Sequence, residues 1–201
     1  MTPQIGELIE RIRALEEELE VELAAKREEL RFKLIDHKVR FEQEMVGRHR
    51  RLKTGLLRYL LQVSPRHLLS APVIYAMLFP MLLLDAFAIL YQFVCFPLYR
   101  IPRVRRRDYL VFDHHNLAYL NLIEKINCAY CSYANGLLSY VKEIAARTEQ
   151  YWCPIKHARR VRQAHSRYSR FVDFGDAEGY RRELENLRCD FNPGGQKEPR
   201  K

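Results

Sequence analysis

The sequence predicts an all-α protein in three parts: a long N-terminal amphipathic helix, a membrane helical hairpin and a small C-terminal helical domain. No proline occurs between Gln4 and Ser64, where Glu, Leu, Lys, Arg and Ala dominate, and these residues are good helix formers. The 32 residues from Leu68 to Tyr99 hold a single charge, Asp85. Beyond residue 113, apolar residues recur at helical spacing. We place the parts at 1–64, 65–107 and 108–190, with a disordered tail at 191–201.

The first part, residues 4–62, carries an apolar repeat of eleven residues. Eleven residues in three turns is about 3.67 residues per turn, which keeps an apolar stripe nearly straight along a helix. Such a stripe must pack against another helix. We favour a coiled coil between subunits, and hence a homo-oligomer, over packing within one chain. Two rows form the stripe: Leu8, Leu19, Leu30 and Phe41, and Ile12, Leu23, Leu34 and Met45.

The second part is long enough to enter a membrane in two ways. As one straight helix, 32 residues would measure about 48 Å, against a hydrocarbon core of about 30 Å. A single tilted span over 72–96 is one solution. A re-entrant hairpin that bends near Pro80 is the other, and we favour it. It keeps both arginine-rich flanks, and both termini, on the cytoplasmic side, as the positive-inside rule prefers.

The position of the basic residues along the sequence favours lipid over nucleic acid as a partner. The formal net charge is +9, a value compatible with either. The basic clusters flank the apolar stretch, however, and juxtamembrane Lys and Arg bind anionic headgroups at about 1 kcal/mol each. This position favours anionic membrane lipids over nucleic acid. The headgroup candidates are Arg66, Arg100, Arg103, Arg105, Arg106 and Arg107.

Asp85 is a candidate polar site inside the membrane segment. Ionisable side chains within membranes usually face a partner or a cavity, and they often mark functional sites. The alternative is structural: Asp85 sits at a bend or pairs with a juxtamembrane arginine. No further polar groups in the segment indicate a transport path.

The third part holds a cluster of cysteines and a histidine. No secretory signal peptide is visible, and five cysteines, an odd number, argue against a disulfide framework. The pattern C-x2-C-x21-C-x3-H could form a closed tetrahedral zinc site, which is normally structural. An iron–sulfur cluster is the alternative cofactor, and plain packing or thiol redox chemistry are further readings. The proposed metal ligands are Cys128, Cys131, Cys153 and His157.

We expect four helices in this part. Asp113 can cap the first, and Asn135-Gly136 is a turn or cap signal that ends it. A second helix follows, and Cys153-Pro154 begins a third, which is basic. A last short helix covers residues 180–187.

Two blocks of this part resemble a bacterial family of uncharacterised inner-membrane proteins. They are Asn127-Cys-Ala-Tyr-Cys-Ser-Tyr-Ala-Asn-Gly136 and Glu143-Ile-Ala-Ala-Arg-Thr-Glu-Gln-Tyr-Trp-Cys-Pro-Ile-Lys-His157. The resemblance covers roughly residues 70–180. It implies a protein of the bacterial inner membrane, and it transfers no activity and no functional residue.

Together these features favour a membrane-anchored scaffold or accessory protein. It would self-associate through residues 4–62 and carry a structural metal in its cytoplasmic domain. A membrane protein is a further candidate partner. The alternative is a membrane-bound redox or lipid-modifying enzyme that uses the same cysteines as an iron–sulfur or thiol centre.

Overall fold

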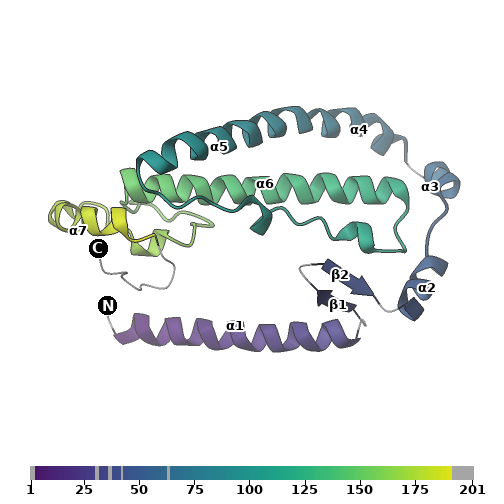
Figure 1. Ribbon diagram of the computed structural model, residues 1–201, viewed down its shortest axis with the longest axis horizontal. Helices are drawn as coiled ribbons and strands as arrows, with labels where there is room; N and C mark the ends of the chain where they lie inside the picture. The colour runs from purple at the N-terminus through teal and green to yellow at the C-terminus, as the bar shows by residue number, and fades with distance from the viewer. Residues whose placement is uncertain (1–2, 30–31, 36–37, 42, 63, 192–201) are drawn as a thin grey trace. The chain divides into compact units, whose positions relative to one another are not determined.

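The computed structural model describes residues 3–29, 32–35, 38–41, 43–62 and 64–191. The chain divides into two compact units. Unit 1 comprises residues 1–63 and 112–129, and unit 2 comprises residues 64–111 and 130–201. The chain is mainly helical, which confirms the predicted class at this level (Figure 1). The expected disordered tail lies almost wholly outside the described residues.

Unit 1 begins with helix α1 (Pro3–Glu29), followed by strands β1 (Phe32–Ile35) and β2 (Lys38–Phe41). The strands pair antiparallel, with Phe32 opposite Phe41 and Leu34 opposite Val39. Helices α2 (Gln43–Arg51) and α3 (Leu56–Gln62) follow. The short 3-10 helix η2 (His114–Asn116) also belongs to this unit.

The prediction of one helix over residues 4–62 is therefore wrong beyond residue 29. Its eleven-residue rows end on different elements, because Leu34 lies in β1 and Met45 in α2. The local sequence explains the strands. Phe32-Lys-Leu and Val39-Arg-Phe alternate apolar and charged residues with a period of two, and Phe and Val favour strands.

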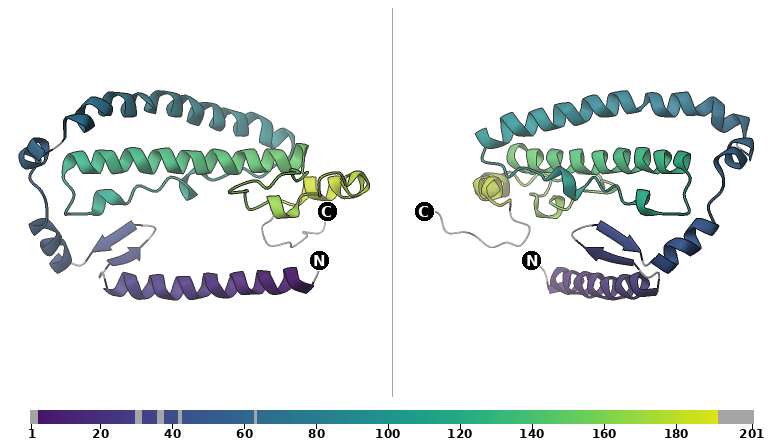
Figure 2. Two further views of the ribbon diagram at one scale, coloured as in Figure 1. Left: turned by 180° about the vertical axis from the view of Figure 1, so that it is seen from behind. Right: turned by 45° about the vertical axis from the view of Figure 1, so that its right-hand side comes forward.

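Unit 2 begins with two helices that run end to end, α4 (Pro65–Ala76) and α5 (Leu78–Leu98). An extended segment, 101–111, then returns beside them and includes the 3-10 helix η1 (Arg106–Asp108). The long helix α6 (Leu122–Trp152) has residues 122–129 in unit 1 and residues 130–152 in unit 2. It lies beside α5 in all three views (Figures 1 and 2). The 3-10 helix η3 (Tyr168–Arg170) and helix α7 (Ala177–Cys189) complete the unit.

The predicted bend near Pro80 is wrong. Met77 joins α4 to α5 with helical backbone angles, φ −63° and ψ −16°. The amide of Met81 donates to the Met77 carbonyl oxygen at 3.3 Å, so the helical path continues across the junction. Pro80 is the third residue of α5, and the first four amides of a helix have no partner inside it, so a proline costs little there.

The predicted division of residues 113–152 into two helices is also wrong. Asp113 precedes η2, and α6 begins later, at Leu122. A capping box fixes this start. The Asn121 side-chain oxygen accepts from the Glu124 amide at 3.0 Å, and the Glu124 carboxylate accepts from the Asn121 amide at 2.8 Å.

Gly136 lies in the interior of α6 and does not end a helix there. It permits a close approach of the returning segment. A Cβ atom at this position would lie 2.6 Å from the Tyr109 carbonyl oxygen and 3.1 Å from the Leu110 Cα. The glycine therefore serves tertiary packing between α6 and residues 109–110.

The core of unit 2 lies between α5, the returning segment and α6. Phe191, which follows α7, is also a buried member of this core. The buried core residues are Ala88, Phe96, Ile101, Val104, Leu110, Leu137, Tyr140, Ile144 and Phe191.

Residues 153–167 contain no α-helix, so the predicted basic third helix is wrong. A buried arginine, Arg167, ties this region to α6. Its guanidinium donates to the Gln150 side-chain oxygen at 2.9 Å and to Glu143 at 3.1 Å. Ile155 and Val172 form an isolated parallel bridge. The predicted helix at 180–187 is confirmed as part of α7.

Candidate membrane-attachment site

Helix α5 has a buried face and an exposed face. Its buried residues are Asp85, Ala88, Gln92 and Phe96, whose spacing of three or four residues places them on one side of a helix. Two of the four are polar. The helix therefore turns its polar side chains toward the protein and most of its large apolar side chains outward. In water, the hydrophobic effect would favour the reverse arrangement.

Asp85 forms the centre of the first polar contact. It is 6% exposed, and its two carboxylate oxygens accept from the Arg106 guanidinium at 2.6 and 3.2 Å. Tyr133, on α6, donates its hydroxyl to the same carboxylate at 3.0 Å. One side chain of α5 thus joins the helix to both of its neighbours in unit 2.

These contacts change the titration of the partners of Asp85. The hydrogen bond that Arg106 donates to Asp85 raises the pKa of Arg106, and burial opposes that rise in part. Burial, together with the hydrogen bond to Asp85, raises the pKa of Tyr133. Arg106 therefore carries a full positive charge, and the phenol of Tyr133 stays protonated as a donor.

Gln92, two turns further along α5, forms the second polar contact. Its side-chain oxygen accepts from the Val104 amide at 2.9 Å, and its nitrogen donates to the Val104 carbonyl oxygen at 3.4 Å. The same nitrogen donates to the Tyr140 hydroxyl on α6. Since Val104 lies in irregular backbone, these bonds satisfy polar groups that no secondary structure would pair.

Helices α4 and α5 together form a helical run over residues 65–98, and the side of this run opposite Asp85 is apolar. We use the name outer face for its six most exposed members within residues 69–98. At 100° per residue these positions fall within one half of the helix circumference, opposite the stripe that contains Asp85. They are Leu69, Val73, Phe79, Phe87, Phe93 and Leu98.

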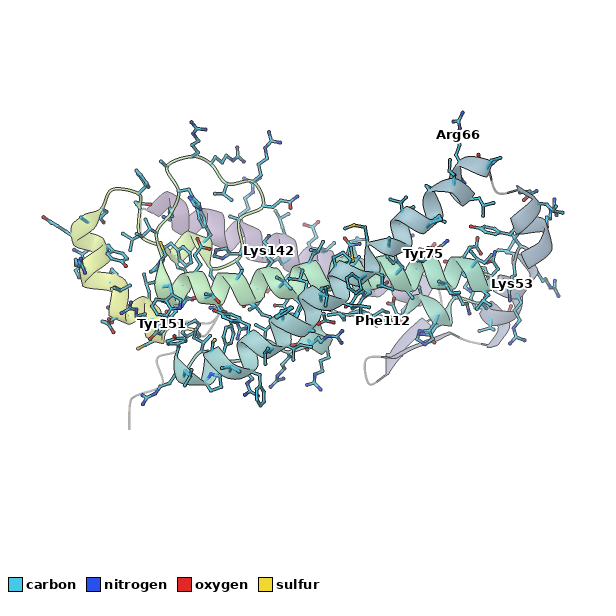
Figure 3. All side chains as sticks on the ribbon, turned by 90° about the horizontal axis from the view of Figure 1, so that it is seen from above. Lys53, Arg66, Tyr75, Phe112, Lys142 and Tyr151 are labelled. Atoms are coloured by element: carbon cyan, nitrogen blue, oxygen red, sulfur yellow. The ribbon has the colours of Figure 1, made fainter. Side chains whose placement is uncertain are left out.

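The six predicted headgroup arginines occupy different positions. Arg66 is exposed on α4, and its side chain projects from that end of the helix in Figure 3. Arg100, Arg103, Arg105 and Arg107 are exposed in the segment after α5. Arg103 also places its guanidinium 4.8 Å from the centre of the Phe93 ring. Arg106 differs from the others, because its guanidinium bonds Asp85.

The structure does not bring the four predicted metal ligands together. Cys131 lies on α6, which runs unbroken to Trp152, and Cys153 follows its end. At 1.5 Å per residue these two cysteines are about 30 Å apart, whereas two ligands of one zinc lie within about 4 Å of each other. Among the described residues, no three His, Cys, Asp or Glu side chains are placed to hold a metal.

The two halves of the cysteine pattern have separate surroundings. Cys128 is half-buried and Cys131 exposed, three residues apart on α6. Helical side chains at that spacing have Cβ atoms about 5–6 Å apart, longer than a disulfide allows, which is about 3.5–4.5 Å. Cys153 is exposed. The ring of His157 stacks on Tyr168, and its backbone amide donates to the Tyr168 hydroxyl at 2.7 Å.

Sequence reasoning missed Gln92, Tyr133 and Tyr140 as partners in the attachment site. A signal for Gln92 was present, because Asp85 and Gln92 are the two carboxylate or amide side chains of the apolar run and lie seven residues apart, on the same helix face. No comparable signal marked the two tyrosines, since their role depends on how α6 packs.

Comparison with known proteins finds no matching family model, no matching curated protein and no matching solved structure. Among the described residues, the 34-residue run Pro65–Leu98 is the one helix that length and composition would allow to cross a membrane.

Proposed function

We propose that this chain is a membrane-attached scaffold or accessory protein. The outer face carries the proposal. Phe87, at the middle of α5, is 65% exposed, and Leu69 on α4 is 82% exposed. Soluble monomers rarely expose contiguous apolar patches of more than a few hundred Å², and larger ones usually mark interaction or membrane sites.

The inner polar stripe supports a membrane over a soluble partner. Asp85 and Gln92 consume their hydrogen-bonding groups within unit 2. The six members of the outer face are Phe, Leu and Val, whose side chains have no hydrogen-bonding group. Protein interfaces carry about one hydrogen bond per 100–200 Å², whereas the acyl chains of a bilayer need none. A bacterial inner membrane, as the sequence resemblance implies, fits this chemistry.

Self-association through α1 is the second element of the proposal. The eleven-residue spacing continues within this helix, where Leu23 follows Ile12. Leu15, Leu19 and Leu23 lie four residues apart and are exposed. A second copy of α1 would cover this row, since the 27-residue helix is long enough for a paired coil.

We leave the structural metal out of this proposal. The four predicted ligands lie at opposite ends of α6, so one chain cannot close a tetrahedral site with them. We also leave out a redox role for Cys128 and Cys131, because their spacing inside a helix opposes a disulfide between them.

Two triple variants test attachment and self-association separately. The first, Phe79→Gln/Phe87→Gln/Phe93→Gln, removes three side chains of the outer face. Burying each is worth about 1.5 kcal/mol or more, so affinity for vesicles should fall at least about a thousandfold. The second, Leu15→Gln/Leu19→Gln/Leu23→Gln, serves as the matched control on α1.

The measurements are flotation with phosphatidylglycerol-containing vesicles and the mass of the particle in detergent by light scattering. We expect the α5 variant to lose flotation and keep its oligomeric mass, and the α1 variant to do the opposite. Flotation of the α5 variant at the level of the unmodified chain would refute the attachment site. An unchanged mass of the α1 variant would refute self-association through that helix.

A further inference from the structure

The helical run 65–98 is placed against the charged segment 101–111 in a way that restricts how it can meet a bilayer. Arg106 bonds Asp85, and Asp85 lies close to the middle of the 34-residue run. Arg105 and Arg107, which flank Arg106 in the sequence, are exposed. The most basic part of the chain thus lies beside the centre of its most apolar helix.

This arrangement opposes a transverse helix. If the run crossed a bilayer, its middle would lie at the midplane and would take Arg105 and Arg107 with it. Arginine is among the most costly residues at that depth. Residues 101–105 have no helix or strand, and irregular backbone does not occur in contact with lipid hydrocarbon.

The length of the run leads to the same conclusion. The outer face extends from Leu69 to Leu98, which at 1.5 Å per residue is about 44 Å. An upright helix would exceed the hydrocarbon core of about 30 Å. A helix in the plane of the membrane has no such limit, and it needs an apolar face on one side only, which is what α5 has.

We propose that α4 and α5 lie flat in one leaflet of an anionic bilayer, with the outer face among the acyl chains and the segment 101–111 on the aqueous side. The proposal rests on the membrane attachment proposed above and specifies its geometry. The chain is monotopic in this arrangement.

Charge complementarity identifies anionic lipid as the occupant of this surface. Arg103 donates to the Phe93 carbonyl oxygen at 3.4 Å and covers the Phe93 ring, so a cation borders the outer face directly. Arg66 and Arg100 are exposed at the two ends of the run. A long arginine side chain beside an apolar face places its charge at the depth of the phosphates.

The flat arrangement also keeps both arginine-rich flanks on one side of the membrane. The predicted hairpin achieved this by a bend near Pro80, which the structure lacks. A helix that never crosses needs no bend, and it obeys the preference for positive charge on the cytoplasmic side equally well.

Tryptophan depth measurements test this geometry in the full chain. Trp152 is the single tryptophan, so Trp152→Phe provides a silent background. Into it we would place one tryptophan at a time: Leu69→Trp, Phe87→Trp or Leu98→Trp. All three positions are exposed, so the larger ring has room.

The probe is fluorescence quenching in phosphatidylglycerol-containing vesicles whose lipids carry bromine at shallow or deep acyl positions. We expect all three tryptophans to be quenched most by the shallow bromine, at equal depth. A Phe87→Trp signal quenched most by deep bromine, with shallow quenching at the other two, would show a transverse helix and overturn the proposal.

Two controls separate this result from other failures. Flotation of each variant reports attachment, so loss of flotation together with loss of all quenching overturns attachment and geometry alike. Flotation with graded depth overturns the geometry alone. If Trp152→Phe lowers the helical circular dichroism, the three tryptophans are read by difference against the unmodified chain.

Discussion

Helices α4 and α5 form one apolar run, yet they relate differently to the rest of unit 2. Helix α4 has no buried residue, whereas α5 has four, and two of these are polar. Most apolar side chains of both helices are exposed, and Ala88 and Phe96 of α5 are the exceptions. The comparison shows that α5 joins unit 2 through two apolar core residues and two polar residues, whereas α4 contributes no buried side chain.

Removing Asp85 should give the largest difference in stability between a variant on α5 and a control on α4. In Asp85→Ala, Arg106 and Tyr133 lose their acceptor. Hydrogen bonds to a charged group are worth about 1.5–3 kcal/mol each, but Arg106 is partly exposed and regains water. We expect the free energy of unfolding to fall by about 2–3 kcal/mol. The measurement is denaturant unfolding in mild detergent, followed by far-UV circular dichroism.

Ser70→Ala is the matched control on α4. The Ser70 hydroxyl bonds only its own helix, to the His67 carbonyl oxygen at 3.2 Å, so we expect a change within about 0.5 kcal/mol. In the double variant Asp85→Leu/Arg106→Leu, part of the loss should be recovered, because apolar pairs often replace buried ion pairs without penalty. Equal losses in Asp85→Ala and Ser70→Ala would refute the contrast between the helices.

Gly136→Ala tests the close approach of the returning segment to α6. The added Cβ would meet the Tyr109 carbonyl oxygen at 2.6 Å, and backbone cannot move aside as a side chain can. Overpacking of this kind typically costs about 1–3 kcal/mol. Gly47→Ala, in α2, has nothing within 4 Å of its new Cβ and should gain about 0.5–1 kcal/mol from helix propensity. A stabilising Gly136→Ala would show that the approach is looser.

Arg103→Gln should have a smaller effect, confined to lipid binding. One arginine near an anionic surface contributes about 1 kcal/mol, or about fivefold in affinity. We expect that loss in vesicles containing phosphatidylglycerol and none in neutral phosphatidylcholine vesicles, as measured by sedimentation at low salt. An equal loss on both lipids would mean that Arg103 acts by holding Phe93 in place and not by its charge.

The sequence predicted the apolar run and the last helix because both have strong local patterns. It left two readings of Asp85 open, and the structure shows the pairing with a juxtamembrane arginine. The start of α6 was also readable, since Asn121 and Glu124 form a capping box pattern. Strands β1 and β2 were missed because the eleven-residue apolar spacing continues through both of them.

The local sequence did not predict that α6 continues without a break through Gly136. Asn135-Gly136 is a common turn signal, but here the glycine accommodates backbone from residues 109–110. That need arises from tertiary packing. The metal hypothesis came from the spacing C-x2-C-x21-C-x3-H alone. That spacing does not show that one unbroken helix lies between the two halves of the pattern.

Metal content should give the smallest difference of all. Because α6 holds Cys131 and Cys153 about 30 Å apart, the two halves of the pattern cannot share an ion within one chain. We expect elemental analysis of the purified, untagged chain to give less than one zinc per chain, and Cys128→Ser/Cys131→Ser to leave that value unchanged. One zinc or several irons per chain, lost in both this variant and Cys153→Ser, would require α6 to break near Gly136. Gly136→Ala would then change metal content as well as stability, which ties the metal question to the same glycine that sets the packing of the returning segment.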